Sequence, residues 1–325
     1  MTASDTGLVA AYELDGHGGG RTIGWQEIRA WQPEESRLWV HLDYESETAR
    51  QWLLQQSGLE ETIAEALIAS ETRPRSLATH GGLLVVLRGA NLNTGADADD
   101  MVAVRVWLEP GRIITTRRRH IQTIDAIRQS IAAGQGPTGP GDFLVQLAEG
   151  LTTRVGEALV DLDDEVDALE DEVLSAESYE LRTKIGAFRR SAIRFRRYLA
   201  PQKDTILRLQ SERVDWLDEG HRAHLREIGD RALRFVEDLD SARDRAAVAQ
   251  DELSSRLSEQ MNKTMYVLSI VAGIFLPLGL LTGLLGINVG GMPGVDSHWA
   301  FIVVCVILVV VAVGQVVFFR RKGWM

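Results

Sequence analysis

The residues best suited to bind a cation stand close together near the carboxyl end of the sequence. Gly286, Ile287 and Asn288 form a GIN triplet, and Asp296 and His298 follow it. An amide carbonyl can replace part of a cation's hydration shell without adding a formal charge. A carboxylate with an imidazole suits zinc better than magnesium. The triplet therefore predicts an entrance site for a cation. Asp296 and His298 are candidate metal ligands. The alternative, that they are loop residues without a ligand role, is equally favoured.

This stretch connects two long apolar runs. Asp296 is the only formally charged residue between Lys263 and Arg320, and each run matches the roughly 20 helical residues that cross a hydrocarbon core. The connection carries no lysine or arginine, whereas basic residues flank both runs, so the positive-inside rule places both termini in the cytoplasm of a multi-pass inner-membrane protein. The expected segments are a first span at 264–286, a connection at 287–298, a second span at 299–319 and a basic tail at 320–325.

The composition excludes several classes of function. Lysine and arginine total 35 against 46 acidic residues, and this net charge of -11 argues against a nucleic-acid partner that needs a broad basic footprint. One cysteine, Cys305, permits neither an intramolecular disulfide nor a cysteine-based zinc cluster. The sequence contains no P-loop, GxGxxG after a strand, GxSxG or HExxH motif, so we expect neither an enzyme nor a resident cofactor.

The first 140 residues predict a cytoplasmic α+β domain. Short runs rich in Val, Ile, Leu and Trp predict strands, and helical spacing occurs between them. The basic cluster at 117–120 admits either an anion site or a solvated turn, and the turn is favoured. Glycines and prolines at 134–141 predict a linker. The expected strands are 38–42, 83–87, 101–108 and 112–116, and the expected helices are 47–57 and 59–70.

Residues 141–263 predict long helices with a coiled-coil-like pattern. Ten carboxylates lie between Glu157 and Glu177, and a basic stretch follows, so two oppositely charged antiparallel helices are expected. Accumulation of cations near a pore is a compatible second interpretation. From Asp215 to Lys263 no proline interrupts the apolar spacing, which predicts one helix that continues into the first span. The expected apolar seams are Val155, Leu159, Leu162, Val166, Leu169 and Val173, then Leu225, Ile228, Ala232, Phe235, Leu239, Ala242, Ala246, Ala249 and Leu253.

Several of these features together resemble the CorA superfamily of divalent-cation transporters. They are the α/β domain, the long helix entering the membrane, GxN at the end of the first span, Met292 and Pro293 after it, and the final RRKGW. The sequence GINVGGMPG is most similar to the ZntB branch, which is associated with zinc. The resemblance implies a funnel-shaped homopentamer in which five copies of the first span surround a pore. It assigns the pore-lining positions to Met265, Leu268, Leu276 and Gly279, with Thr282 one turn above, and a cytoplasmic acidic ring to Asp251.

Departures from the magnesium-type members bear on selectivity. Leu285 and Ile287 replace the aromatic residue and the methionine of YGMN, and Gly290 and Gly294 replace acidic residues of the outer loop. We therefore expect transport of zinc, with cadmium and nickel as further candidates, and uptake as the direction that the membrane potential favours. Proton coupling stays open. The alternatives are a magnesium, cobalt or nickel channel of the CorA type and a non-conducting membrane-anchored sensor or scaffold.

Overall fold

The chain folds into two compact units, Met1–Gln250 and Asp251–Met325. The computed structural model describes residues 7–33, 36–70, 72–79, 81–175, 179–286 and 298–324. One helix, α7 (Glu219–Leu285), contributes residues to both units. This 67-residue helix confirms the prediction that a soluble segment continues without a break into the first apolar run.

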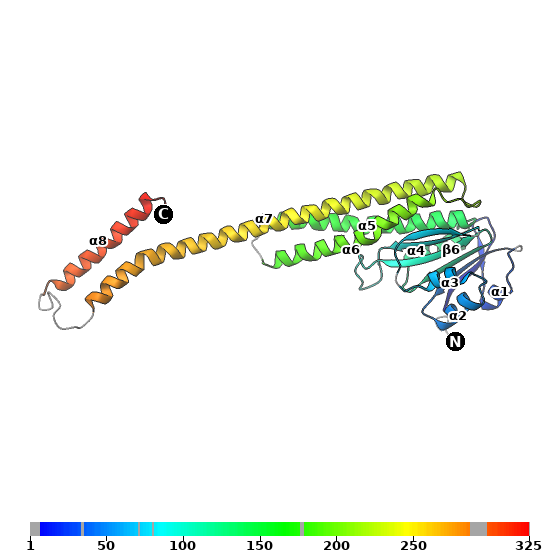
Figure 1. Ribbon diagram of the computed structural model, residues 1–325, viewed down its shortest axis with the longest axis horizontal. Coiled ribbons are helices and arrows are strands. Elements are labelled where there is room, and N and C mark those ends of the chain that lie inside the picture. The colour runs from blue at the N-terminus through cyan, green and yellow to red at the C-terminus, as the bar shows by residue number, and fades with distance from the viewer. Residues whose placement is uncertain are drawn as a thin grey trace. The chain divides into compact units, whose positions relative to one another are not determined.

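The first unit is built on a seven-stranded sheet (Figure 1) with the order β2-β1-β3-β7-β6-β5-β4. The central pair, β3 and β7, is parallel, and the other neighbouring pairs are antiparallel. All four strands expected from the sequence are present, and β1, β2 and β4 are additional. The strands are β1 (Leu8–Leu14), β2 (Gly20–Thr22), β3 (Arg37–Asp43), β4 (Arg75–Thr79), β5 (Gly82–Gly89), β6 (Val102–Glu109) and β7 (Arg112–Arg117).

Helices cover both faces of this sheet and create two hydrophobic cores. One face packs against α1 (Trp25–Ala30), α2 (Glu47–Gln55) and α3 (Glu61–Ile68). The other face packs against α4 (Gln122–Ala132) and against the nearby parts of α5, α6 and α7. Because side chains alternate between the two faces of a strand, Leu84 and Trp107 belong to the first core while Val85 and Val106 belong to the second.

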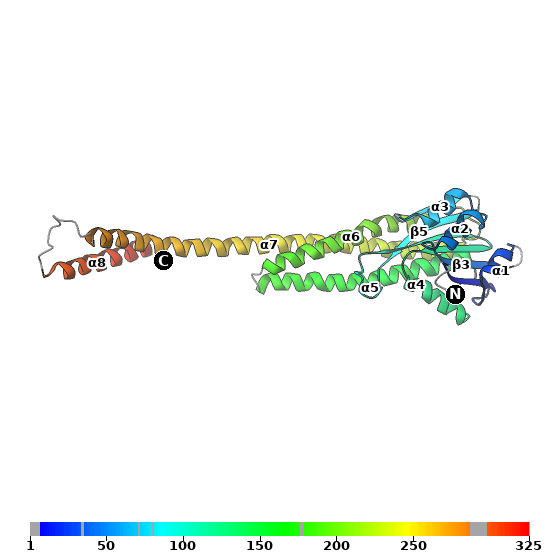
Figure 2. The same ribbon diagram turned by 90° about the horizontal axis from the view of Figure 1, so that it is seen from below.

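The three long helices of the first unit continue the second core. α5 (Pro140–Ser175) and α6 (Tyr179–Leu209) lie side by side with the first part of α7 (Figure 2). The expected seam of α5 is buried throughout, and so is that of α7 except at Phe235, where Val236 is the buried residue. The Phe235 ring rests instead against Gly156 of α5, where a methyl group would lie 2.8 Å from its Cζ.

The glycine- and proline-rich segment 134–141 connects α4 to α5 within the first unit. Gly134 adopts a φ of 71°, which ends α4, and Gly136 N donates to Gly18 O at 2.7 Å. Phe143 and Leu144 of α5 are fully buried in the same core as the sheet. The sequence-based boundary at residue 140 therefore does not coincide with the division between the compact units.

The second unit contains the apolar part of α7 and α8 (Ala300–Arg321). Both helices are long and apolar enough to span a membrane, and the most apolar stretch of each is left unburied by the protein. Exposed apolar surface of this extent requires contact with lipid or with other protein surfaces. The two spans expected at 264–286 and 299–319 correspond to these helices.

Candidate functional site

The predicted pore-lining residues form one exposed face on the apolar part of α7. At about 100° per residue, Met265, Leu268, Leu276 and Gly279 fall within roughly 80° of one another around the helix. The exposed fractions are 60% for Met265, 68% for Leu268 and 71% for Leu276. A methyl group added to Gly279 would meet no atom within 4 Å. The face is thus a continuous apolar surface that no other part of the described chain covers.

Another side of α7 packs against α8. A methyl group added to Gly273 would lie 3.1 Å from Cζ of Phe319, so the glycine makes room for this ring. Ile270, Ile274 and Leu278, which lie roughly opposite the exposed face around α7, are half-buried. The packing of the two membrane helices therefore leaves the predicted pore-lining face free.

The packed face of α8 includes the two polar or reactive side chains within the apolar part of this helix, 300–319. Cys305 and Gln315 are both half-buried, at a spacing of ten residues that keeps them on one helical face. Cys305 thus has a packing position. Gln315 is a residue that the sequence analysis overlooked: its Oε1 is buried and lacks a hydrogen-bond partner in the described part of the chain. The signal that could have identified Gln315 is a single amide side chain within an apolar run.

Thr282 lies beside the exposed face, about 60° from Gly279 in the direction away from Leu276. Its hydroxyl donates within the helix, with Leu278 O and Gly279 O each 3.0 Å from Oγ1. The oxygen's lone pairs stay available on the helix surface. Thr282 can therefore offer an oxygen to a passing cation without any change of its own hydrogen bond.

The outer end of the predicted entrance site falls only partly within the described residues. Gly286 closes α7, where its N donates to Thr282 O at 2.9 Å. His298 is exposed just before α8. Ile287, Asn288 and Asp296 lie outside the described residues, so the structure does not test whether the triplet and the Asp–His pair meet.

Asp251, the predicted acidic ring position, is exposed on α7. By helical register it lies on the same side of the helix as Met265, about 40° away, whereas Leu253 is buried on another side. It forms no ion pair with any described residue. Among the described residues no group of three or more His, Cys, Asp or Glu side chains is arranged to hold a metal ion. A metal site at Asp251 would need carboxylates from other copies of the chain.

The acidic side chains of α5 pair mainly with α7. Arg245 reaches Asp163, Asp167 and Glu170, while the basic helix α6 contributes Lys184 to Glu172 at 2.9 Å. Hydrogen bonds from these carboxylates raise the pKa of Arg245 above its usual range. The expected acidic and basic helices are neighbours, but the arginine that pairs with three of the α5 carboxylates comes from α7.

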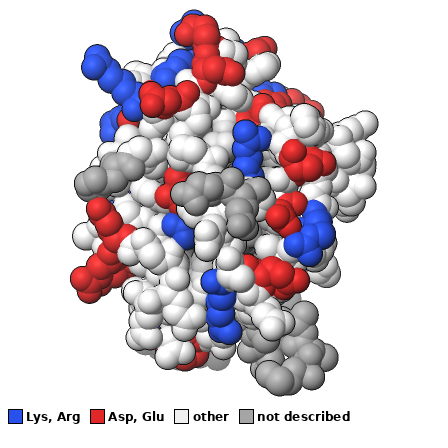
Figure 3. All heavy atoms as spheres, turned by 90° about the vertical axis from the view of Figure 1, so that its right-hand side faces the viewer, with Lys and Arg blue, Asp and Glu red and all other residues white. Residues whose placement is uncertain are grey.

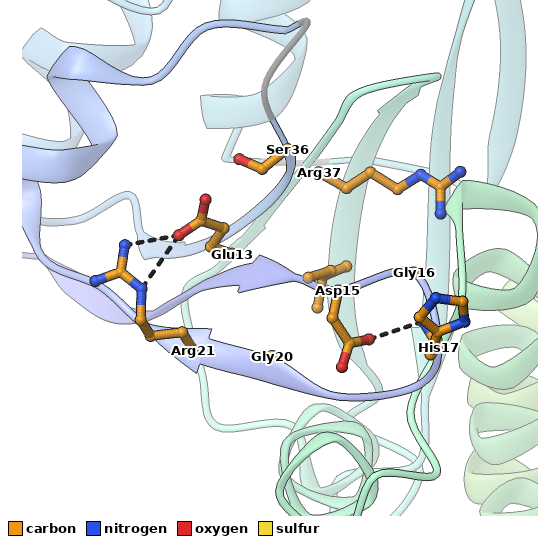
Figure 4. Close-up of a pocket in the computed structure, with 9 residues that line it drawn as sticks. Glu13, Asp15, Gly16, His17, Gly20, Arg21, Ser36 and Arg37 are labelled. Atoms are coloured by element: carbon orange, nitrogen blue, oxygen red, sulfur yellow. Dashed lines mark hydrogen bonds and ion pairs between the residues drawn. The ribbon is translucent and has the colours of Figure 1, made fainter.

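The polar side chains that line a pocket beside the β1–β2 hairpin pair with one another and with the backbone of the turn (Figure 4). Arg21 Nη2 pairs with Glu13 Oε2 at 2.6 Å, and Asp15 Oδ1 accepts from the backbone N of His17 at 2.7 Å and of Gly19 at 2.9 Å. The hydrogen bond from His17 is the main reason that the pKa of Asp15 is lowered. These polar groups stabilise the turn, so His17 is accounted for as a loop residue.

The arrangement of a mixed sheet, three long helices and an apolar hairpin agrees with a known family over most of the chain. The family model described as CorA-like Mg2+ transporter protein matches residues 34–321. The chain belongs to this family. The CorA family is one of transporters and not of enzymes, and its membership together with the two candidate spans places the chain in a membrane.

Known relatives align with this chain over almost its whole length. It is 39% identical to the divalent cation transporter CmaX of Pseudomonas aeruginosa over 100% of this chain and 98% of the relative. It is 37% identical to the zinc transport protein ZntB of Yersinia pseudotuberculosis over 98% of this chain and 96% of the relative. The resemblance to the CorA superfamily and to ZntB proteins is thereby confirmed, with CmaX at a similar level of identity.

Solved structures confirm the fold. Full-length CmaX matches with a TM-score of 0.85 at 37% identity and covers 100% of both chains. The CorA magnesium transporter from Methanocaldococcus jannaschii matches with a TM-score of 0.80 over 97% of this chain and 98% of that chain. At 19% identity, the second likeness shows the fold alone.

Proposed function

We propose that this protein carries divalent cations, zinc foremost, through an axial pore formed by α7 of five identical chains. The observation that carries the proposal is the exposed face of Met265, Leu268 and Leu276, each at least 60% exposed and turned away from the packing with α8. Two helices cannot enclose a pore, so conduction requires several copies. Five copies that converge on this face would bury its apolar side chains against one another.

The proposed pathway combines a polar entrance with apolar constrictions. Gly286, Ile287 and Asn288 form the entrance, where amide and backbone carbonyls replace part of the water around the ion. Gly279 and Thr282 follow, and rings of Leu276, Leu268 and Met265 form the narrow apolar part, which closes when water leaves it. A ring of Asp251 at the cytoplasmic side attracts the emerging cation.

Zinc is proposed on two grounds. Relatives that are 37% identical over 98% of this chain are named zinc transport proteins. In addition, Asp296 and His298 repeated around a ring would supply carboxylate and imidazole ligands, which suit zinc better than magnesium. Cadmium and nickel share enough of this ligand chemistry to be carried as well.

Uptake is the proposed direction of transport. The protein is proposed to lie in the inner membrane with both termini in the cytoplasm. An inside-negative potential of 100 mV is worth about 2.3 kcal/mol per charge, hence about 4.6 kcal/mol for a divalent ion moving inward. Proton coupling would need a titratable group on the pathway. The described residues of the two apolar spans include no aspartate or glutamate, so Asp296 and His298 are the groups to test for it.

Zinc flux into liposomes that contain the purified oligomer tests the proposed entrance. We expect Asn288→Ala to lower the initial rate roughly tenfold or more, because a ligand to a charged species is lost. Ser297→Ala, a polar truncation in the same connection, serves as the matched control and should retain the rate of the unmodified protein. Equal flux in Asn288→Ala would reject the entrance site, and a monomer or dimer in detergent would reject the pore.

Magnesium is the second candidate substrate, with cobalt and nickel. The matching family model is described as a Mg2+ transporter, which favours this candidate. Competition settles the choice in the same liposomes: excess magnesium abolishes zinc entry if the pathway is of the magnesium type and leaves most of it if zinc is preferred. The assay repeated with and without a pH gradient tests proton coupling.

A further inference from the structure

A cavity of about 490 Å³ in the first unit is lined by six arginines. It opens where β3 and β7 end and β6 begins, close to Tyr44 and Met101. Its volume lies within the range of about 300–1,000 Å³ that is typical of small-molecule sites. The arginines are Arg73, Arg88, Arg105, Arg118, Arg119 and Arg197.

Arg105 is the most deeply buried of these arginines. Its exposed fraction is 1%, and its Nη2 donates to Ala69 O and, at 3.4 Å, to Tyr44 Oη. The Nε and Nη1 groups are buried without a hydrogen-bond partner among the described residues. A buried guanidinium with unused donors is costly, because it has lost water without gaining an acceptor. An anion in the cavity would supply the missing acceptors.

Arg88 stands beside it with neutral partners. Its side chain donates to Thr72 O and Met101 O, and its Cζ lies 4.0 Å from the centre of the Tyr198 ring. Burial lowers the pKa of both Arg88 and Arg105. Positive charge from the other arginines acts in the same direction, so the cavity is lined by mutually repelling groups.

The carboxylates around the cavity balance only part of this charge. Asp100, which pairs with Arg119, is the one acidic residue that lines it within the described part of the chain. Arg118 pairs with Glu45 at 2.7 Å from outside the lining. The other four arginines form no ion pair with any described residue. By contrast, acidic and basic side chains are interspersed over the face of the molecule in Figure 3.

We propose that this cavity binds a small phosphate-bearing anion with more than one negative charge, such as pyrophosphate or the polyphosphate of a nucleotide. Arginine forks match phosphate oxygens in charge and geometry. The number of unpaired guanidinium groups exceeds what a single monoanion would neutralise. The basic run at 117–120, for which the sequence left an anion site as the less favoured interpretation, supplies two of the lining residues. The site is independent of the proposed pore, since it uses only residues of the first unit.

Calorimetric titration of the full-length protein, purified without metal, tests the site with pyrophosphate, ATP, AMP and adenosine as probes. We expect pyrophosphate and ATP to bind, with an affinity that falls as salt increases, and adenosine not to bind. Tighter binding of ATP than of pyrophosphate would identify a nucleotide ligand, and equal binding would identify the polyphosphate as the recognised group. Absence of binding by both polyphosphates, or binding of adenosine, would overturn the proposal.

Charge-removing variants locate the binding. Arg73→Gln combined with Arg197→Gln alters exposed side chains at the cavity without threatening the fold, and should weaken pyrophosphate binding roughly tenfold or more. Arg105→Gln should weaken it at least as much. Arg50→Gln on α2, an exposed arginine outside the cavity, is the matched control and should leave the affinity unchanged. Equal affinity in the double variant and in the control would overturn the assignment, even if a polyphosphate binds elsewhere.

Discussion

The two compact units place their apolar side chains in opposite environments. In the first unit Trp39, Phe143 and their neighbours are fully buried between the sheet and the helices. In the second unit Leu276 and Phe301 are 71% and 78% exposed. The first unit therefore carries its own hydrophobic core, whereas the second leaves its apolar surface to be covered by lipid or by other protein surfaces. Truncation of an apolar side chain should accordingly have different consequences in the two units.

The largest expected difference is between two phenylalanines. Phe143→Ala should lower the free energy of unfolding of the first unit by about 3–5 kcal/mol, because it leaves a cavity where the ring meets Trp39 edge-on at 5.0 Å between ring centres. Phe301→Ala, the matched control on α8, should leave that free energy unchanged. Denaturant unfolding of the two variants in detergent, followed by circular dichroism, provides the measurement. Similar losses in both would contradict the contrast between the units.

The sequence predicted the structure best where the local pattern of residues is enough to determine it. A charge-free apolar run of about 20 residues is typical of a membrane span, and the spacing of apolar residues predicted the α7 seam almost residue by residue. The resemblance supplied the pore-lining assignments on α7, which stay predictions; on the helix Met265, Leu268 and Leu276 share an exposed face. The edge strand β4 was overlooked because its side chains are mostly exposed and its sequence, RSLAT, alternates little.

Features that depend on distant residues were beyond sequence reasoning. The cavity collects Arg88, Arg105 and Arg197 from three elements, and no local pattern announces that they meet. The pairing of the acidic helix with Arg245 of α7 depends equally on tertiary packing. The segment 134–141 has the composition of a linker, but the buried Phe143 after it keeps α5 in the core of the first unit.

A second difference between the units is their response to pH, since the core of the first contains a buried histidine. Burial, followed by the positive charges of Arg117 and Arg128, lowers the pKa of His41 to about 3. The unfolded chain, with a histidine pKa of about 6.5, binds this proton first, so the first unit should lose stability as the pH falls from about 6.5 towards 3, by about 2 kcal/mol at pH 5.

Denaturant unfolding at a series of pH values measures this slope, and His41→Gln supplies the comparison. The variant has no group that titrates at this position, so its stability should vary less between pH 6.5 and 5. His41 Nδ1 lies 2.8 Å from Thr115 Oγ1, and the glutamine amide can retain a partner there. An unchanged pH slope in the variant would show that other groups cause the acid sensitivity of the first unit.

The smallest expected effects separate packing from conduction within the second unit. Gly273→Ala places a methyl group 3.1 Å from the Phe319 ring, so it should lower the thermal stability of the helix pair by about 1 kcal/mol. Gly279→Ala meets no atom of its own chain and should leave that stability unchanged. If five copies converge on this face, however, the added methyl groups narrow the pore and zinc flux into liposomes falls. If zinc flux is lost in Gly273→Ala and retained in Gly279→Ala, the assignment of the conducting face to the Gly279 side of α7 is wrong.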